Sequence, residues 1–308
     1  MTNQKFVLQK FDNFGLKKLS WTHLDALDEN CRKYLKENFR FLDKTTIDEL
    51  LAQETRPVFY PTSGGYFLNL RGINLNDNCE PEDMVSIRIW FDKNQIISTR
   101  RRPLKSVINL AQIIQEKQEK IDDIGDFLTK LISLLLDKID GHIMKMSEDI
   151  DSFEEEIIEN SKHISRNQLV ILRKQLIMLK RYLFPQKQVI ASLIDEAGLL
   201  SKENKRVLQS KFDQLLRFIE ELDAIYQRVG VLKDELSSVL SDKMNKNMYV
   251  LSVIAAIFLP LGFLTGLLGI NVGGIPGSEN ESAFMNFCII LVVIIVVQIL
   301  LFKIKKWF

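Results

Sequence analysis

A short turn near the C-terminus carries the residues best suited to hold a hydrated metal ion. An uncharged run ends in Gly269-Ile270-Asn271, and Val272-Gly273-Gly274-Ile275-Pro276-Gly277 follows. The amide oxygen of Asn271 is a neutral acceptor that can bind a cation's hydration water. The C-terminus of a helix adds unpaired carbonyls and partial negative charge, and the glycines permit a tight turn that exposes more carbonyls. For such a turn taken alone, an asparagine that merely caps the helix is the simpler interpretation.

Two carboxylates lie in the same loop. Glu279 and Glu281 are the acidic residues of the segment 271–283, which contains no Lys or Arg. Their field can concentrate cations near the turn. The competing interpretation is that both are ordinary solvated side chains.

Two apolar segments flank this loop and are long enough to cross a membrane. Residues 249–270 carry no charge, and neither do residues 284–302; a spanning helix needs about 20 apolar residues. The positive-inside rule predicts both termini in the cytoplasm and the loop outside, because the flanking lysines are Lys243, Lys246, Lys303, Lys305 and Lys306. A buried hairpin in a soluble protein is disfavoured by two such runs with this charge bias.

Neither apolar segment contains Asp, Glu, His, Lys or Arg. Since tight zinc sites use His, Cys or carboxylate ligands, we expect no tightly protein-ligated metal site, and a transported ion would cross largely hydrated. Two helices cannot enclose a polar path, so several copies must surround any pore. Gly262 and Gly266 have the spacing that lets helices pack closely, either between copies or within one chain.

The charged residues are concentrated before the first apolar segment. The chain has 41 Lys+Arg and 40 Asp+Glu, 81 in all with a net charge of +1, and only five of them lie beyond Met248. The near-neutral total argues against nucleic-acid binding. The first ten residues lack an apolar signal region, and Cys31, Cys79 and Cys288 show no paired or metal-type spacing. Both features favour a cytoplasmic N-terminal domain.

Residues 1–120 are predicted to form an α/β region with a mixed sheet, and residues 121–248 to form long helices and a stalk. Strands are expected at 6–11, 57–60, 66–73, 84–91 and 95–99, and helices at 24–38, 46–53 and 104–117. Three long helices should cover 124–160, 165–197 and 202 into the first span. The third has a heptad-like stripe that predicts packing on other helices: Leu208, Phe212, Leu215, Ile219, Leu222, Tyr226, Val229, Leu232, Leu236 and Val239.

Other conspicuous groups favour structural roles. His23, His142 and His163 lack the spacing of metal ligands. The acidic run at Asp149, Asp151 and 154–156 is typical of a solvated helix face. The segment Arg100–Arg102 favours an exposed turn over an anion site. With no phosphate-binding glycine loop and no nucleophile beside a base, the sequence does not indicate an enzyme.

The Gly-x-Asn turn between two C-terminal spans resembles the CorA family of divalent cation transporters. Its GGIP continuation is similar to the bacterial zinc-transport branch, the ZntB type, more than to the magnesium branch. The segments 172–186 (LRKQLIMLKRYLFPQ) and 98–102 (STRRR) and the final KKWF are also similar to that branch. The resemblance therefore covers nearly the whole chain.

The resemblance implies a funnel-shaped homopentamer in the bacterial inner membrane, with Gly269, Ile270 and Asn271 as its selectivity filter. It implies that the first span lines the pore through Asn245, Met248, Leu251, Ala255, Leu259 and Gly262. Met248, Leu251 and Leu259 would form apolar constrictions that gate by dewetting. Residues 303–308 would be a basic cytoplasmic tail.

The leading hypothesis is uptake of zinc into the cytoplasm, with proton coupling implied by the resemblance. The first alternative is a CorA-type magnesium, cobalt or nickel channel. The second, from another class, is a membrane-anchored sensor or scaffold. The expected partners are further copies of the chain, the lipid membrane and the transported cation, with H+ as a second candidate cargo; no resident cofactor is expected.

Overall fold

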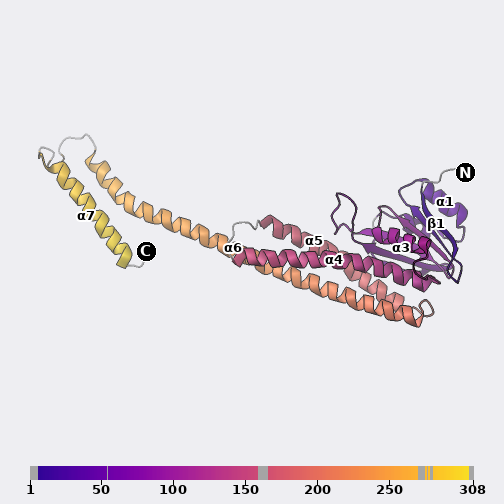
Figure 1. Cartoon of the computed structure of the whole chain (residues 1–308). Coiled ribbons are helices and arrows are strands. Elements are labelled where there is room, and N and C mark those ends of the chain that lie inside the picture. Colours follow the sequence, from indigo (N-terminus) through magenta and orange to yellow (C-terminus); the bar gives the residue numbers. More distant parts are fainter. Residues whose placement is uncertain are drawn as a thin grey trace. The chain divides into compact units, whose positions relative to one another are not determined.

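The computed structural model describes residues 6–53, 55–158, 166–269, 275, 277 and 280–304 (Figure 1). The chain divides into two compact units, Met1–Asp234 and Glu235–Phe308. Helix α6 (Lys202–Leu268) begins in the first unit and ends in the second. Each unit is described by itself below.

A six-stranded mixed sheet organises the first unit. Its spatial order is β1-β2-β6-β5-β4-β3, and all neighbours are antiparallel except β2 and β6, which are parallel. The strands are β1 (Val7–Phe14), β2 (Leu19–Asp25), β3 (Val58–Thr62), β4 (Gly65–Gly72), β5 (Val85–Phe91) and β6 (Gln95–Arg100). This arrangement confirms the predicted mixed sheet.

Strand β2 is where the sequence-based prediction was wrong. A helix was expected from residue 24, but Leu19–Asp25 is a strand and the helix α1 begins only at Asn30. Strand β2 lies inside the sheet, and Leu19, Trp21 and Leu24 are fully buried. A strand covered on both faces lacks the alternation of apolar and polar residues that identifies a strand in a sequence.

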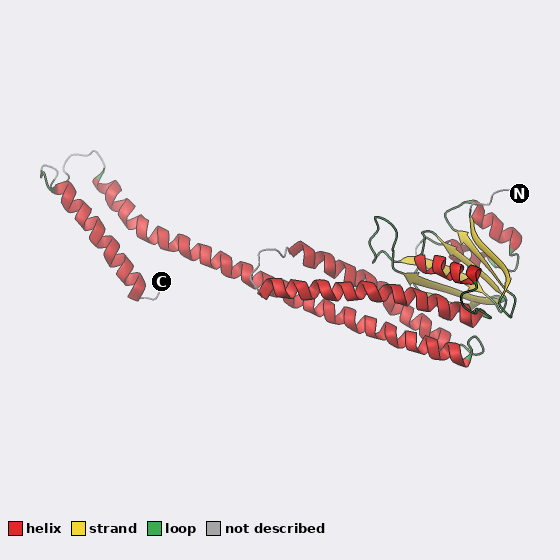
Figure 2. Cartoon of the chain, in the orientation of Figure 1, coloured by secondary structure: helices red, strands yellow, loops and turns green. Residues whose placement is uncertain are grey.

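Helices cover both faces of the sheet (Figure 2). On one face, α1 (Asn30–Asn38) and α2 (Lys44–Leu51) enclose a core that includes Leu24, Phe67 and Trp90. On the other, α4 (Ile124–Ile158) packs an edge of Phe127 on the Trp21 ring at 5.0 Å between centroids. Helix α3 (Lys105–Glu116) lies beside α4.

The long helices α4, α5 (Arg166–Asp195) and the first part of α6 pack through apolar stripes. The predicted stripe on α6 is confirmed at Leu208, Leu215, Ile219, Leu222, Val229 and Leu232, which are buried. Phe212, Tyr226, Leu236 and Val239 are half-buried. Phe218 and Ile225 are buried as well, so the apolar face is wider than a heptad seam, as expected for a helix that packs against two others.

The acidic run on α4 is only partly solvated, which corrects the sequence-based interpretation. Arg228 of α6 donates from Nε to Glu154 Oε1 at 2.7 Å, and it also pairs with Asp151. This hydrogen bond lowers the pKa of the Glu154 carboxyl. Lys180 of α5 similarly pairs with Asp223 of α6. These pairs join neighbouring helices at the bundle surface.

The second unit contains the end of α6 and α7 (Ala283–Ile304). Both helices are long and apolar enough to cross a membrane. Only 6% of the most apolar stretch of α6 is buried, and none of that of α7. A core helix of a soluble protein would instead be buried, so the exposure agrees with the predicted pair of C-terminal membrane helices.

Candidate functional site

The end of α6 presents two different faces. One is shielded: Val253 is only 8% exposed, and Ala256, Ile257, Pro260 and Leu264 are half-buried. These positions are three or four residues apart and so lie on one side of the helix. Ala256 in this stripe accepts a hydrogen bond from Gln298 of α7, which identifies the stripe as the α7-facing side.

The residues predicted to line a pore lie on the other face, except Asn245, which precedes Ala256 by about three helical turns. Met248, Leu251 and Leu259 are 59%, 67% and 74% exposed. At about 100° per residue, Leu251, Ala255, Leu259 and Gly262 lie roughly opposite the α7-facing stripe. Asn245, Ala255 and Gly262 are exposed too. The chain's own second helix therefore leaves the whole predicted pore-lining set uncovered.

A proline and a glutamine together stabilise the contact between α6 and α7. Pro260 has no N–H, so it cannot donate to the carbonyl of Ala256, four residues earlier. Gln298 Nε2 donates to that same carbonyl oxygen at 3.3 Å. In a membrane, where no water can satisfy the backbone, a neighbouring helix must supply the missing donor. The sequence signal for this pairing was a single glutamine inside the apolar run of α7.

Replacing Gln298 with leucine should destabilise the helix pair by about 0.6 kcal/mol, the mean for interhelical hydrogen bonds in membranes. The same replacement should cost little in a Pro260→Ala background, because alanine returns an N–H to the Ala256 carbonyl. Thermal melting in detergent measures the stability of the wild type, Q298L, P260A and the double variant. The exposed Val297→Leu is the control. If Q298L lowers stability equally with proline and with alanine at position 260, this pairing is ruled out.

The paired glycines do not pack against any part of the chain that the structure describes. A Cβ built on Gly262 or Gly266 meets no atom within 4 Å. The interpretation of this spacing as intrachain packing is therefore wrong. Packing between copies of the chain remains the prediction for these glycines.

The predicted filter follows directly from the end of α6. Gly269 N donates to Thr265 O at 2.9 Å, closing the last turn of the helix. Thr265 Oγ1 donates to the carbonyls of Leu261 and Gly262 at 2.9 and 3.1 Å. Ile270, Asn271 and Glu279 lie outside the described residues, so the filter stays a prediction from the sequence.

The loop re-enters the described part of the chain just before α7. Gly277 has φ +83°, a left-handed conformation that favours glycine. Asn280 N donates to Gly277 O at 3.1 Å, and Asn280 Oδ1 accepts from Ser282 N at 3.0 Å. Glu281 is exposed between these two hydrogen-bonded residues. This local network sets the start of α7 and leaves the Glu281 carboxylate in solvent.

Titratable side chains elsewhere have structural surroundings. His23 is buried with Nδ1 at 2.8 Å from Ser98 Oγ, and burial lowers its pKa to about 3. Burial likewise raises the pKa of the Cys31 thiol to about 12. His163 lies outside the described residues. Within the described ranges, no three His, Cys, Asp or Glu side chains are grouped to hold a metal ion.

Comparisons with known proteins agree with these features along almost the whole chain. The family model described as "CorA-like Mg2+ transporter protein" matches residues 17–306. The zinc transport protein ZntB of Vibrio parahaemolyticus is 36% identical over 286 residues, which cover 92% of this chain and 87% of that protein. ZntB of Yersinia enterocolitica is 34% identical over 288 residues, which cover 93% of this chain and 87% of that protein.

Solved structures share the fold. The full-length CmaX protein superposes with a TM-score of 0.80 at 32% identity, covering 99% of this chain and 93% of that one. The ZntB cytoplasmic domain from V. parahaemolyticus superposes with a TM-score of 0.68 at 26% identity, covering 77% of this chain and 99% of the domain. With a family model that matches nearly every residue and relatives above 30% identity, the chain belongs to the CorA-like family of membrane transporters, in the branch of its ZntB relatives.

Proposed function

We propose that this protein carries divalent metal cations across the membrane, with zinc entering the cytoplasm as its main substrate. The observation that supports this most is the uncovered face of α6, which leads directly into the Gly-x-Asn turn. The identity to proteins named zinc transport protein supports zinc as the cation. The cation is cargo, and the proposal requires no resident cofactor.

The path for the ion requires several copies of the chain. Two helices cannot surround an aqueous path, and no described residue of the chain covers the exposed face of α6. We propose a homopentamer, as the family resemblance implies, in which this face lines the lumen. Native mass spectrometry in mild detergent should give a five-chain species. A strictly monomeric protein that still transports metal would contradict this assembly.

The ion would cross with most of its water shell. The first span, which we propose lines the path, offers neutral oxygens and apolar side chains, not the His, Cys or carboxylate ligands that strip water from zinc. A ring of Asn271 amide oxygens would select the hydrated cation at the outer end of α6. The apolar rings at Met248, Leu251 and Leu259 would close the path when they dewet.

The proposed orientation places both termini in the cytoplasm and the 271–283 loop outside the bacterial inner membrane. The lysines that flank the spans support it through the positive-inside rule. So does the likeness of the sheet and long helices to a domain named as cytoplasmic in the Vibrio protein. In this orientation Glu279 and Glu281 lie on the side from which metal enters.

Ion uptake into proteoliposomes, compared for zinc and magnesium with and without a proton gradient, tests the substrate. We expect faster zinc than magnesium influx, and an inward proton gradient should accelerate it. Faster magnesium influx would instead support the CorA-type channel. Absence of influx for both ions would favour the sensor or scaffold hypothesis and contradict the proposal.

Neutralising both Glu279 and Glu281 to glutamine should reduce zinc influx mainly at low salt and low zinc. A ring of exposed carboxylates raises the local cation concentration, and salt screens this effect over about 8 Å at physiological ionic strength. The maximal rate should stay nearly unchanged. Initial influx against zinc concentration at two ionic strengths measures the effect. An equal loss of maximal rate at both would assign the glutamates to the permeation site itself.

A further inference from the structure

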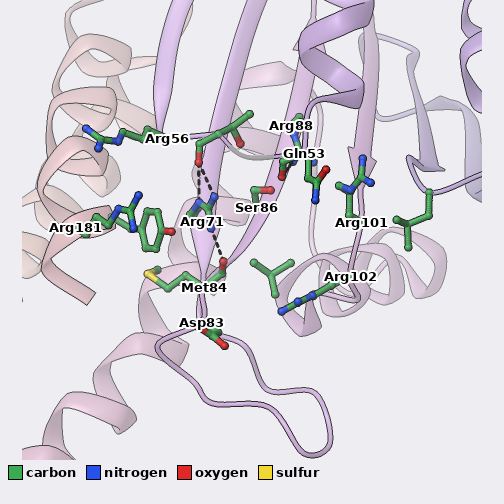
Figure 3. Close-up of a pocket in the computed structure, with 14 residues that line it drawn as sticks. Gln53, Arg56, Arg71, Asp83, Met84, Ser86, Arg88, Arg101, Arg102 and Arg181 are labelled. Carbon is green, nitrogen blue, oxygen red and sulfur yellow. Dashed lines mark hydrogen bonds between the residues drawn. The ribbon is translucent and has the colours of Figure 1, made fainter. Parts of the chain in front are cut away.

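An arginine-rich cavity lies in the first unit, away from the membrane helices in the sequence (Figure 3). It measures about 790 Å³, and β4, β5, α5 and the segment after β6 contribute to its wall. Its arginines are Arg56, Arg71, Arg88, Arg101, Arg102 and Arg181. Asp83 is the one acidic residue among the described residues of the lining. Among the described residues of the lining, positive charge therefore exceeds negative charge.

Two buried arginines form the floor of the cavity. Residue pairing places Asn69 opposite Arg88 and Arg71 opposite Ser86, so Arg71 and Arg88 project from the same face of the sheet on adjacent strands. Arg88 is fully buried and donates from Nη2 to Gln53 O at 3.3 Å. Its Nε and Nη1 have no hydrogen-bond partner within the described residues.

The environment of Arg88 is unfavourable for a cation with no counter-charge. Burial and the nearby guanidinium groups of Arg101 and Arg71 lower the pKa of Arg88 to about 10, so it remains charged at neutral pH. Buried donors are normally satisfied, and buried charges are normally paired. An anion in the cavity beside it would supply the missing counter-charge.

Arg71 is held rigidly beside this unsatisfied group. Its Nη1 donates to Met84 O and its Nη2 to Thr55 O, both at 2.6 Å (Figure 3). Its guanidinium also lies over the Tyr182 ring of α5, at 4.0 Å from the centroid. These contacts fix the orientation of the Arg71 guanidinium at the cavity wall.

The rim is built differently from the floor. Arg56, Arg102 and Arg181 are exposed and Arg101 is half-buried. In the described parts of the chain, the ion pairs of the protein involve none of these four residues, nor Arg88. Long side chains that form no ion pair with the described residues can close on a ligand of several charges. The triplet Arg100–Arg102, interpreted from the sequence as an exposed turn, thus contributes two rim residues.

We propose that this cavity binds a small, multiply charged phosphate compound, such as an inorganic polyphosphate or the phosphate chain of a nucleotide. Guanidinium groups bind phosphate oxygens in pairs of parallel hydrogen bonds. A chain of phosphates can engage floor and rim together, which a single small anion cannot. The volume falls in the usual range for small-molecule sites, roughly 300–1,000 Å³. The proposal stands independently of whether the protein transports zinc.

Titration calorimetry on the purified full-length protein, in metal-free buffer at low ionic strength, tests the site. Tripolyphosphate should bind about tenfold or more tightly than orthophosphate, and added salt should weaken it. If ATP binds more tightly than tripolyphosphate, the site recognises nucleotides. If the two bind equally, the site recognises the phosphate chain alone. Adenosine should not bind, and adenosine binding equal to that of ATP would overturn the proposal.

Substitutions at the rim locate the binding. R102Q/R181Q removes two exposed lining arginines and should weaken tripolyphosphate binding about 100-fold, or tenfold per lost charged contact. R206Q/R217Q removes the same charge from exposed positions on α6 and should change it less than about twofold. Equal affinity of the rim variant and the α6 control, or tripolyphosphate no tighter than orthophosphate, would refute the site.

Discussion

Replacing Asn271 with alanine is expected to reduce zinc influx at least 100-fold while leaving folding and assembly intact. The change removes one amide oxygen per chain from the predicted ring. A hydrogen bond involving a charged group contributes about 1.5–3 kcal/mol, and the oligomer repeats the loss in every copy. The last turn of α6 is closed by the bond from Gly269 N to Thr265 O, before Asn271 in the chain, so we expect the helix to form in the variant.

The matched control for this variant is Asn286→Ala. Asn286 is an exposed asparagine in the first turn of α7, so the two variants make the same chemical change on either side of one loop. Influx into proteoliposomes and oligomer size by native mass spectrometry should be measured for both. Wild-type influx in N271A, or equal losses in the two variants, would remove Asn271 from the filter.

Leu259 tests whether the uncovered face of α6 lines the ion path. This side chain is 74% exposed on the face opposite α7. Leu259→Lys would place a ring of positive charge in the path and should abolish zinc influx, at least 100-fold, because like charges in a narrow low-dielectric pore repel strongly. Leu259→Asp adds negative charge of the same formal size. This variant should retain zinc influx, or increase it, because the carboxylates keep the constriction hydrated.

The two variants carry charges of opposite sign, so comparing them distinguishes a residue that faces the ion path from one that packs against lipid or another helix. Both introduce a charge at the same membrane position, where insertion of either is costly. Initial zinc influx at matched protein density is the measurement. If L259K and L259D lose influx to the same extent, Leu259 contacts lipid or a neighbouring helix and does not face the ion.

The membrane helices and the α6 stripe could be predicted because their signals are local. Uncharged runs bounded by lysines require no knowledge of the fold, and the spacing from Leu208 to Leu232 reports one helix face directly. Strand β2 could not be predicted in the same way. Its interior position depends on pairing with β6, more than 70 residues later in the chain, and its two faces are covered by α1, α2 and α4. None of these partners can be identified from the local sequence.

The arginine cavity illustrates the same limit for a site. Arg71, Arg88 and Arg181 are separated by long stretches of sequence, and only the pairing of β4 with β5 and the position of α5 bring them to one cavity. The Pro260–Gln298 pairing likewise needs the contact between α6 and α7. By contrast, Gly-x-Asn is a local motif, which is why the filter could be predicted from the sequence although Asn271 lies outside the described residues.

Zinc influx into liposomes that contain only this purified protein tests the central claim most directly. A fluorescent zinc indicator inside the vesicles should report influx that scales with the amount of protein and falls to the level of protein-free vesicles for N271A. Influx no faster than in protein-free vesicles, from protein that is folded and assembled, would contradict the account.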